Sequence, residues 1–247
     1  MRIIISPAKK MNIDTDTLQY KDVPVFMDRA KKLTEKIQNL SYEECKALWK
    51  CNDKIAKQNV TRFAEMNLEQ RLTPAILSYE GIQYQYMAPS VFEECQLDYI
   101  QKNLRILSGF YGVVKPMDGV TPYRLEMQAD LAIDGSSNLY EYWGDALYQE
   151  VLDESRIFIN LASKEYSKCI EKYLQPQDVY ITCVFGEYDG KKVRQKGTYA
   201  KMARGEMVRF MAAHQVEDVQ ELKRFEGLGY RFREDLSTET EYVFTTN

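Results

Sequence analysis

Short runs of β-branched and aliphatic residues recur along the chain, and such runs are typical of buried strands. They span residues 2–5, 75–79, 104–107, 156–161 and 179–185. Between them lie longer segments in which apolar residues return every three or four positions, as they do on one face of an amphipathic helix. These segments span residues 25–40, 90–103, 139–152, 164–174 and 197–214. Strands that alternate with helices predict an α/β fold with a mixed β-sheet flanked by helices.

Two segments are expected to turn back on themselves as antiparallel hairpins. The Asp189-Gly190 pair marks a tight turn that leads into residues 191–195, and residues 230–232 and 241–244 form a second pair near the end. No linker, internal repeat or low-complexity tract divides the chain. We therefore predict a single compact domain over residues 1–247, with a helical lobe at about residues 25–71.

Composition narrows the class of protein. Hydrophobic residues make up 45% of the chain and charged residues 28%, which is ordinary for a globular protein. No apolar run approaches the roughly 18 residues of a membrane-spanning helix, so we expect no membrane partner and a cytoplasmic location. The five cysteines form no C-x-x-C pair and there is one histidine, which argues against a zinc or iron–sulfur site. A carboxylate metal site stays open but has no motif, so we expect no metal and no cofactor. No feature predicts an oligomeric state.

Polar residues follow several of the predicted strands. Ser6 and Lys9 come just after the first strand, and Asn160 and Ser163 come at the end of a later one. Open α/β sheets place ligand-binding groups at the carboxyl ends of their strands. A plain turn with a solvated lysine is the simpler interpretation of the first pair, and Ser163 could equally well be only the cap of the following helix. Both interpretations stay open at this point.

The segment 104–127 is unusually dense in glycine and proline, which fix or free particular backbone angles. It contains Ser108 and Tyr111, and near its end Arg124 and Glu126 are two positions apart. These last two could form a buried ion pair, or they could act as a phosphate clamp and a general acid or base.

Basic residues gather in the last third of the chain. The group consists of Lys191, Lys192, Arg194, Lys196, Lys201, Arg204 and Arg209, with only Glu206 among acids in that stretch. Lys201 and Arg204 are three residues apart and share one edge of the predicted helix. Gly205, inside that helix, is expected to permit close approach of another backbone or a ligand. A solvated charge run is the simpler interpretation, and a surface that follows a phosphate backbone is the functional one.

Several motifs occur in an order that resembles the YaaA family, bacterial proteins linked to resistance to peroxide stress. The motifs are SGFYGVVKPMDGVTPYRLEM at 108–127, ISPAK at 5–9, LYEYWG at 139–144, NLASKEY at 160–166, YAKMARGEM at 199–207 and GYRF at 229–232. The resemblance implies binding of double-stranded DNA in a basic cleft and a lower level of intracellular free iron. No element that would read bases is visible, so we expect little sequence preference.

The resemblance also implies particular DNA contacts. The main candidates are Lys191, Lys192, Lys196, Lys201, Arg204 and Arg209, and the secondary ones are Lys9, Lys115, Arg124 and Lys164. The family is further described as carrying a helix-hairpin-helix element, whose glycine N–H groups contact phosphate. Residues 108–113 resemble such a hairpin, with Gly109 and Gly112 as the phosphate-binding glycines, although these are three residues apart rather than two.

A second hypothesis is an enzyme that acts on a nucleotide or a nucleic-acid base. Its motivation is the recurrence of uncharged or acidic polar residues in the motifs, namely Ser6, Ser108, Tyr111, Glu126, Asn160 and Ser163. No nucleophile–histidine arrangement and no phosphate-binding glycine loop is present, so binding without catalysis is the preferred hypothesis. A pocket too narrow for duplex DNA would favour the enzyme, and a wide basic groove would favour the binding protein. An iron or redox buffer is the least favoured.

Overall fold

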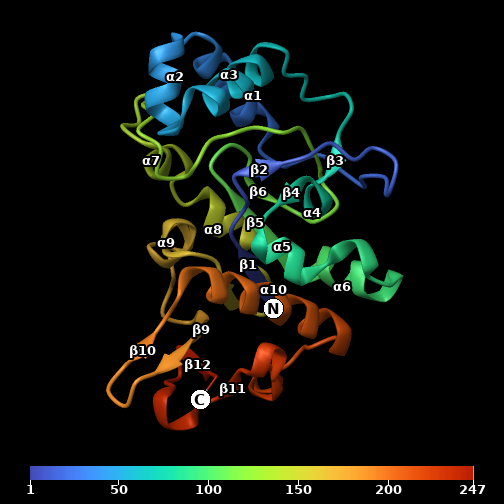
Figure 1. Ribbon diagram of the computed structural model, residues 1–247, viewed down its shortest axis with the longest axis vertical. Coiled ribbons are helices and arrows are strands. Elements are labelled where there is room, and N and C mark those ends of the chain that lie inside the picture. The colour runs from blue at the N-terminus through green and yellow to red at the C-terminus, as the bar shows by residue number, and fades with distance from the viewer. Residues whose placement is uncertain (247) are drawn as a thin grey trace.

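The computed structural model describes residues 1–246 and has a mixed β-sheet at its centre (Figure 1). In the described chain this sheet has eight strands in the order β11-β12-β9-β8-β1-β5-β6, and β10 pairs with β9 beside that path. The strands are β1 (Arg2–Ile5), β5 (Leu104–Ser108), β6 (Gly112–Val114), β8 (Ile157–Leu161), β9 (Val179–Tyr188), β10 (Val193–Arg194), β11 (Arg231–Phe232) and β12 (Glu241–Thr245). The predicted α/β class is confirmed.

Five of the strands form a parallel set. Strand β1 pairs in parallel with both β5 and β8, and β8, β9 and β12 continue the set on one side. Numbered by their order in the chain, these five strands lie as 2-1-3-4-5. The connection from β1 therefore leads to β5 on one side of β1, and the chain later crosses to β8 on the other side of β1. The place between β1 and β8 is a topological switch point, where ligands bind in doubly wound sheets.

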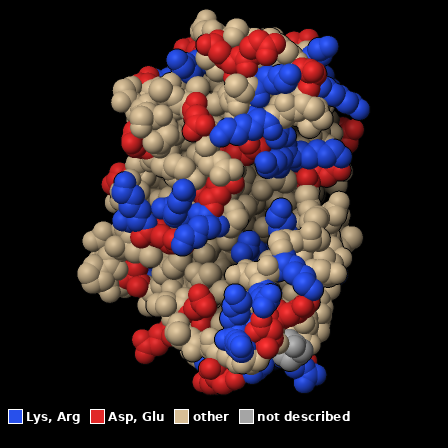
Figure 2. Space-filling model, turned by 60° about the vertical axis from the view of Figure 1, so that its left-hand side comes forward, with Lys and Arg blue, Asp and Glu red and all other residues tan. Residues whose placement is uncertain are grey.

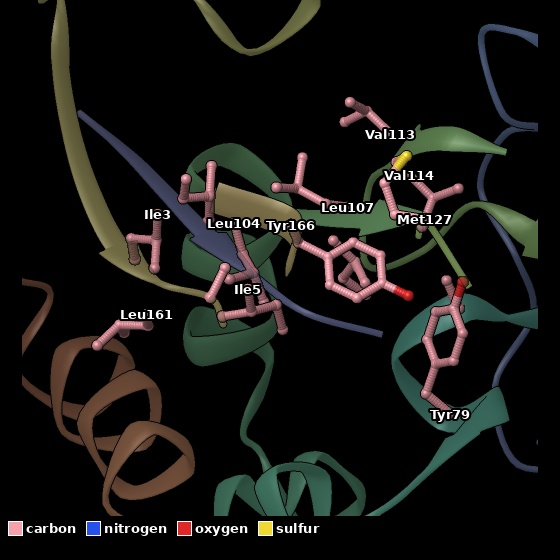
Figure 3. Close-up of a cluster of buried hydrophobic side chains, with 14 of the residues drawn as sticks. Ile3, Ile5, Tyr79, Leu104, Leu107, Val113, Val114, Met127, Leu161 and Tyr166 are labelled. Carbon is pink, nitrogen blue, oxygen red and sulfur yellow. The ribbon is translucent and has the colours of Figure 1, made fainter. Parts of the chain in front are cut away.

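Strand β1 is the centre of the hydrophobic core. Ile3, Ile4 and Ile5 are fully buried, which explains why this strand reads as a continuous apolar run instead of an alternating one. Figure 3 shows Leu104 and Leu161, from the two neighbouring strands, gathered around it. Burial on both faces fixes the position of the residues that follow β1.

The predicted N-terminal lobe is helical, as expected. It contains α1 (Met27–Gln38), α2 (Tyr42–Trp49) and α3 (Asp53–Ala64), which lie together at the top of Figure 1. Ser41 caps α2 in a box with Glu44, in which each side chain accepts a hydrogen bond from the other residue's backbone N–H. The lobe packs above the sheet and leaves the carboxyl end of β1 to other elements.

Helix α10 (Gly197–His214) has the bounds that the sequence pattern predicts. It packs against α5 (Ile82–Met87) and approaches it so closely at Gly205 that an added Cβ would lie 2.1 Å from the carbonyl oxygen of Gln83. The expected close approach of another backbone is thus confirmed. Two longer helices remain, α6 (Glu94–Asn103) and α9 (Lys164–Glu171). The single helix predicted at residues 139–152 is instead two short ones, α7 (Leu139–Trp143) and α8 (Ala146–Val151), separated at Gly144, which has a φ of +55°.

Short elements complete the fold. They are β2 (Lys10–Met11) paired with β4 (Tyr79–Glu80), β3 (Thr73–Pro74) paired with β7 (Gly119–Val120), and the helix α4 (Ala75–Ser78). The strand predicted at 75–79 is therefore wrong, because most of that run is α4. A run of four or five apolar residues does not distinguish a buried strand from a buried helical turn. No helix in the described chain is long and apolar enough to cross a membrane.

The helix-hairpin-helix element expected at residues 108–113 is not confirmed. That segment joins β5 to β6, and Ser108 pairs with Gly112 across an antiparallel hairpin. A Cβ at Gly109 would lie 2.5 Å from the carbonyl oxygen of Leu125, and Gly112 packs against the Trp143 ring with a φ of +76°. Both glycines are buried in the domain. They serve tight packing and a left-handed turn, and they do not face outward toward a phosphate.

Candidate functional site

A cavity of about 370 Å³ lies over the switch point, at the carboxyl ends of β1 and β8. Its walls come from the turn after β1, the start of α5, the Tyr123–Glu126 segment, the start of α9 and one edge of α10. The polar and charged residues that line it are Ser6, Lys9, Lys10, Glu80, Gln83, Arg124, Glu126, Ser163, Glu165, Lys201 and Arg204. The topology thus brings together four of the sequence motifs.

Ser6 and Ser163 form the floor between the two strand ends. The backbone N–H of Ser163 donates to Ser6 Oγ at 2.8 Å, and Ser6 Oγ donates to Ser163 Oγ at 3.1 Å. Ser163 precedes α9, yet its hydroxyl caps no N–H of that helix. Because Ser163 Oγ accepts from Ser6, its own proton is left to donate elsewhere. The geometry therefore supports Ser163 as a polar group of the cavity and not as a cap of α9.

Arg124, Glu126 and Lys9 form one charged wall. Nη2 of Arg124 lies 3.2 Å from Glu126 Oε1, and Lys9 Nζ lies 3.3 Å from the same oxygen. The side chains of Arg124 and Glu126 are each 12% exposed, whereas that of Lys9 is 63% exposed. Arg124 and Glu126 therefore form a largely buried ion pair, and Lys9 covers it from the solvent side.

Lys201 and Arg204 stand on the α10 edge of the cavity, one turn apart. Among the described residues neither has a carboxylate partner, and the buried Nε of Arg204 has no hydrogen-bond acceptor. Burial lowers the pKa of Arg204, but an arginine starts so high that it keeps its charge. These two cations are available to an anionic ligand.

Carboxylates offset part of this positive charge. Five cations and three carboxylates line the cavity, and Glu80 pairs with Lys10 at 2.7 Å. Burial raises the pKa of Glu165, and the nearby charge of Glu126 acts in the same direction. The site therefore holds hydrogen-bond acceptors beside its cations, which a bare phosphate site would not need.

Three tyrosines, Tyr84, Tyr123 and Tyr166, line the cavity together with the apolar residues Pro7, Ala8, Ile82 and Leu125. The hydroxyl of Tyr84 donates to the Ser6 carbonyl at 2.9 Å and holds the turn after β1 in place. Burial raises the pKa of Tyr123 to about 12, so its phenol stays protonated. Figure 3 shows Tyr166 extending from the aliphatic core. These rings shape the cavity and are poorly suited to act as bases.

Three of the six residues predicted for a polar pocket line the cavity, namely Ser6, Glu126 and Ser163. Ser108, Tyr111 and Asn160 do not, because they lie behind it in the core. Ser108 Oγ accepts the N–H groups of Phe110 and Tyr111, and the side-chain oxygen of Asn160 accepts the N–H of Ala162. The hydroxyl of Tyr111 accepts the N–H of Thr121. These three residues hold the loops that build the site.

The cations predicted to contact DNA are divided among several places. Lys9, Arg124, Lys201 and Arg204 line the cavity. Lys191 and Lys192 are exposed at the tip of the β9–β10 hairpin, Lys196 pairs with Glu187 at 2.8 Å, and Lys164 lies 4.0 Å from Glu171. Arg209 is exposed but lies about 140° around α10 from Arg204. Lys115 lines a different hollow with Asp22 and Asp118.

The side of the molecule in Figure 2 carries basic and acidic side chains intermingled, with basic ones bordering a hollow near the middle. No group of three or more His, Cys, Asp or Glu side chains in residues 1–246 is arranged to hold a metal ion.

Sequence reasoning missed Glu80, Gln83, Tyr84, Glu165 and Tyr166 as cavity residues. Glu165 and Tyr166 lie inside the NLASKEY motif and directly follow Ser163, so the motif itself was a signal. The other three precede or begin the short helix α5 and carry no comparable pattern. Glu80, Gln83 and Tyr84 reach the cavity because α10 packs closely against α5 at Gly205.

The fold and the cavity define a class, that of α/β proteins with a polar, cation-rich cavity at a topological switch point. Comparison with known proteins then gives the family. Residues 1–236 match the family model described as peroxide stress protein YaaA. The chain therefore belongs to this family, and the resemblance seen in the sequence motifs is confirmed.

Close relatives span the whole chain. A UPF0246 protein of Agathobacter rectalis is 63% identical over 244 residues, which cover 99% of this chain and 98% of the relative. One from Lachnoclostridium phytofermentans is 56% identical over 99% of this chain and 96% of its own length. One from Pediococcus pentosaceus is 52% identical over 100% of this chain and 98% of its own length.

Proposed function

We propose that the protein binds double-stranded DNA through its sugar–phosphate backbone, as part of the cytoplasmic response to peroxide. The observation that carries this proposal is the pair Lys201 and Arg204. Both are cations at the cavity edge without a carboxylate partner among the described residues. Cations already neutralised by a neighbouring carboxylate gain less from a phosphate, so unpaired ones are the best candidates for backbone contacts.

The size of the cavity limits how a duplex would be bound. A volume of about 370 Å³ is at the lower end of the range for small-molecule sites, so a duplex would lie across the mouth. Lys201 is exposed there and would contact a phosphate directly. Lys9 and Lys10 are also exposed, and they would contact phosphates by giving up their ion pairs with Glu126 and Glu80. Lys191 and Lys192, on the exposed hairpin, would extend the contact.

The proposal has three further parts, which concern the compartment, the sequence preference and intracellular free iron. Five free cysteines fit a reducing compartment such as the cytoplasm. Contacts from lysine and arginine to the backbone carry no sequence information, so we expect little sequence preference. The effect on intracellular free iron stays a prediction of the family resemblance.

The test is duplex DNA binding by the purified protein, followed by fluorescence anisotropy over a series of salt concentrations. Backbone binding predicts an affinity that falls steeply with salt, with a log–log slope of about −0.9 for each phosphate neutralised. Two duplexes of unrelated sequence should bind within about threefold of each other. Absence of binding at low salt would overturn the proposal.

A second candidate function, an enzyme that acts on a nucleotide or a nucleic-acid base, is favoured by one observation. Ser6, Glu126 and Ser163 converge in a cavity narrower than a duplex, which is the arrangement this hypothesis requires. Glu126 or Glu165 would be the general acid or base. Incubation with deoxynucleotides and with single-stranded DNA, followed by chromatography, would reveal a product. Unchanged substrates would rule out this candidate for those substrates.

A further inference from the structure

The cavity contains two kinds of polar group on different walls. The α10 edge supplies positive charge from Lys201 and Arg204, and Ser163 offers a hydroxyl proton on the floor. The Tyr123–Glu126 segment and the start of α9 supply the carboxylates of Glu126 and Glu165, and Glu126 shares its Oε1 with Arg124 and Lys9. A ligand that uses both must be anionic at one end and a hydrogen-bond donor at the other.

The apolar lining narrows the choice of ligand. The apolar lining comes from Pro7, Ala8, Ile82 and Leu125 and from Tyr84, Tyr123 and Tyr166, three tyrosines that are each at most 6% exposed. An apolar wall beside polar groups suits a planar heterocycle, whose faces are apolar and whose edge carries its polar atoms. The amino and imino groups of a nucleobase donate to carboxylates, as cytosine does to Glu or Asp. Inorganic phosphate alone would leave both the apolar lining and the carboxylates unused.

We propose that the cavity binds a single nucleoside phosphate, with its phosphate at Lys201 and Arg204 and its base against the apolar lining beside Glu126 and Glu165. Two sources share this chemistry: a free nucleotide, and an unpaired nucleotide that a bound DNA strand turns into the cavity. For the second source the inference rests on the proposed function, since the DNA must first lie across the mouth. Turning a nucleotide out of the duplex costs the least free energy where its base is already unpaired.

The position of the cavity supports this assignment independently of its lining. It lies at the switch point between β1 and β8, where the two parallel strands end and their connections diverge. In doubly wound sheets this crevice is the usual ligand site. Ser6 and Ser163 are hydrogen-bonded to each other across it, so the site is already formed without a ligand.

The free nucleotide is tested by equilibrium dialysis with deoxyadenosine monophosphate and deoxyguanosine monophosphate. Deoxyadenosine without phosphate and inorganic phosphate without a base are the controls, and each should bind at least about tenfold more weakly. The variants are Arg204→Gln and Lys201→Ala, which should each weaken nucleotide binding about tenfold. Lys201 is exposed, so its replacement keeps the test valid even if Arg204→Gln fails to fold.

The nucleotide within DNA is tested with two duplexes that differ by one unpaired nucleotide. The protein should bind the duplex with the unpaired nucleotide about tenfold more tightly, and Arg204→Gln and Lys201→Ala should remove that preference. Lys102→Ala is the control, because Lys102 lies near the amino end of β5, away from the cavity. It should change neither the preference nor nucleotide binding.

The outcomes separate this inference from the proposed function. Salt-dependent duplex binding with neither nucleotide binding nor a preference for the unpaired nucleotide would overturn the inference and leave the proposed function standing. Nucleotide binding without duplex binding would overturn the proposed function and support the free nucleotide as the ligand. Nucleotide binding that Lys201→Ala and Arg204→Gln leave unchanged would overturn the assignment of the cavity.

Discussion

Ser6 and Ser163 lie 157 positions apart in the chain and are joined by a hydrogen bond between their hydroxyl groups at 3.1 Å. A second bond runs from the N–H of Ser163 to Ser6 Oγ at 2.8 Å. Ser6 directly follows β1 and Ser163 lies two residues beyond β8, and the two strands pair in parallel from Arg2 with Phe158 to Ile5 with Leu161. This link closes the floor of the cavity and fixes the start of α9 relative to the end of β1.

The contact between α10 and α5 at Gly205 predicts a large effect of one added methyl group. In Gly205→Ala the new Cβ would lie 2.1 Å from the Gln83 carbonyl oxygen, so one helix must move. We expect a loss of about 2–3 kcal/mol in the free energy of unfolding, measured by urea denaturation. Gly197→Ala, in the same helix with no atom within 4 Å, is the control and should be neutral. Equal effects would contradict the close contact.

The two cations that share Glu126 Oε1 should contribute unequally to stability. Arg124→Met leaves Glu126 in a site where both side chains are 12% exposed, and we expect a loss of about 2–4 kcal/mol. Lys9→Met removes a side chain that is 63% exposed, and the expected change is within about 0.5 kcal/mol. Denaturant unfolding of both variants compares them directly. A larger effect of Lys9→Met would contradict the assignment of Arg124 as the main partner.

Asp118 predicts a particular dependence of stability on pH. Burial raises its pKa from 3.8 to about 6, so the folded protein holds this proton more tightly than the unfolded chain. The contribution of protonated Asp118 to the free energy of unfolding is therefore fully present below pH 4 and is lost as the pH rises through about 6. In the wild type the N–H of Lys115 donates to Asp118 Oδ2 at 2.8 Å. The side-chain oxygen of the asparagine in the Asp118→Asn variant can accept the same hydrogen bond.

The measurement is the free energy of unfolding of the wild type and Asp118→Asn between pH 4 and pH 7. The wild type should lose up to about 3 kcal/mol relative to the variant over this range. Two curves that run parallel would show that Asp118 titrates normally in the folded protein.

The cysteines predict an order of chemical labelling. Cys95 is exposed, whereas Cys169 and Cys183 are buried, and burial raises the pKa of each of these two thiols to about 12. Because the thiolate is the reactive form, iodoacetamide at pH 8 should label Cys95 first. Mass spectrometry should find Cys169 and Cys183 labelled only after unfolding in guanidinium. Rapid labelling of Cys183 in the native protein would contradict the packing of β9.

The parts of the fold that a repeating pattern encodes could be predicted from the sequence. The bounds of α10, the helical lobe and both antiparallel hairpins follow from local periodicity and turn residues. The run at 75–79 was mispredicted because four apolar residues fit a helical turn as well as a strand. The order of the strands in the sheet could not be predicted from local sequence patterns, since the pairing of β1 with β8 joins residues more than 150 positions apart.

The candidate site was predictable only in part, for a related reason. Ser6 and Ser163 come after the last residues of their strands and reach the cavity. Ser108 and Asn160 still belong to β5 and β8 and are buried. A shift of one to three residues at a strand end decides between core and cavity, and single-sequence patterns do not place strand ends that finely.

The most direct test of the account is the salt dependence of duplex binding by Lys201→Ala, measured beside the wild type and Lys102→Ala. If Lys201 contacts a phosphate, the log–log slope should become shallower by about 0.9 in Lys201→Ala and stay unchanged in Lys102→Ala. Identical slopes for all three proteins would contradict the claim that the α10 edge of the cavity binds the DNA backbone.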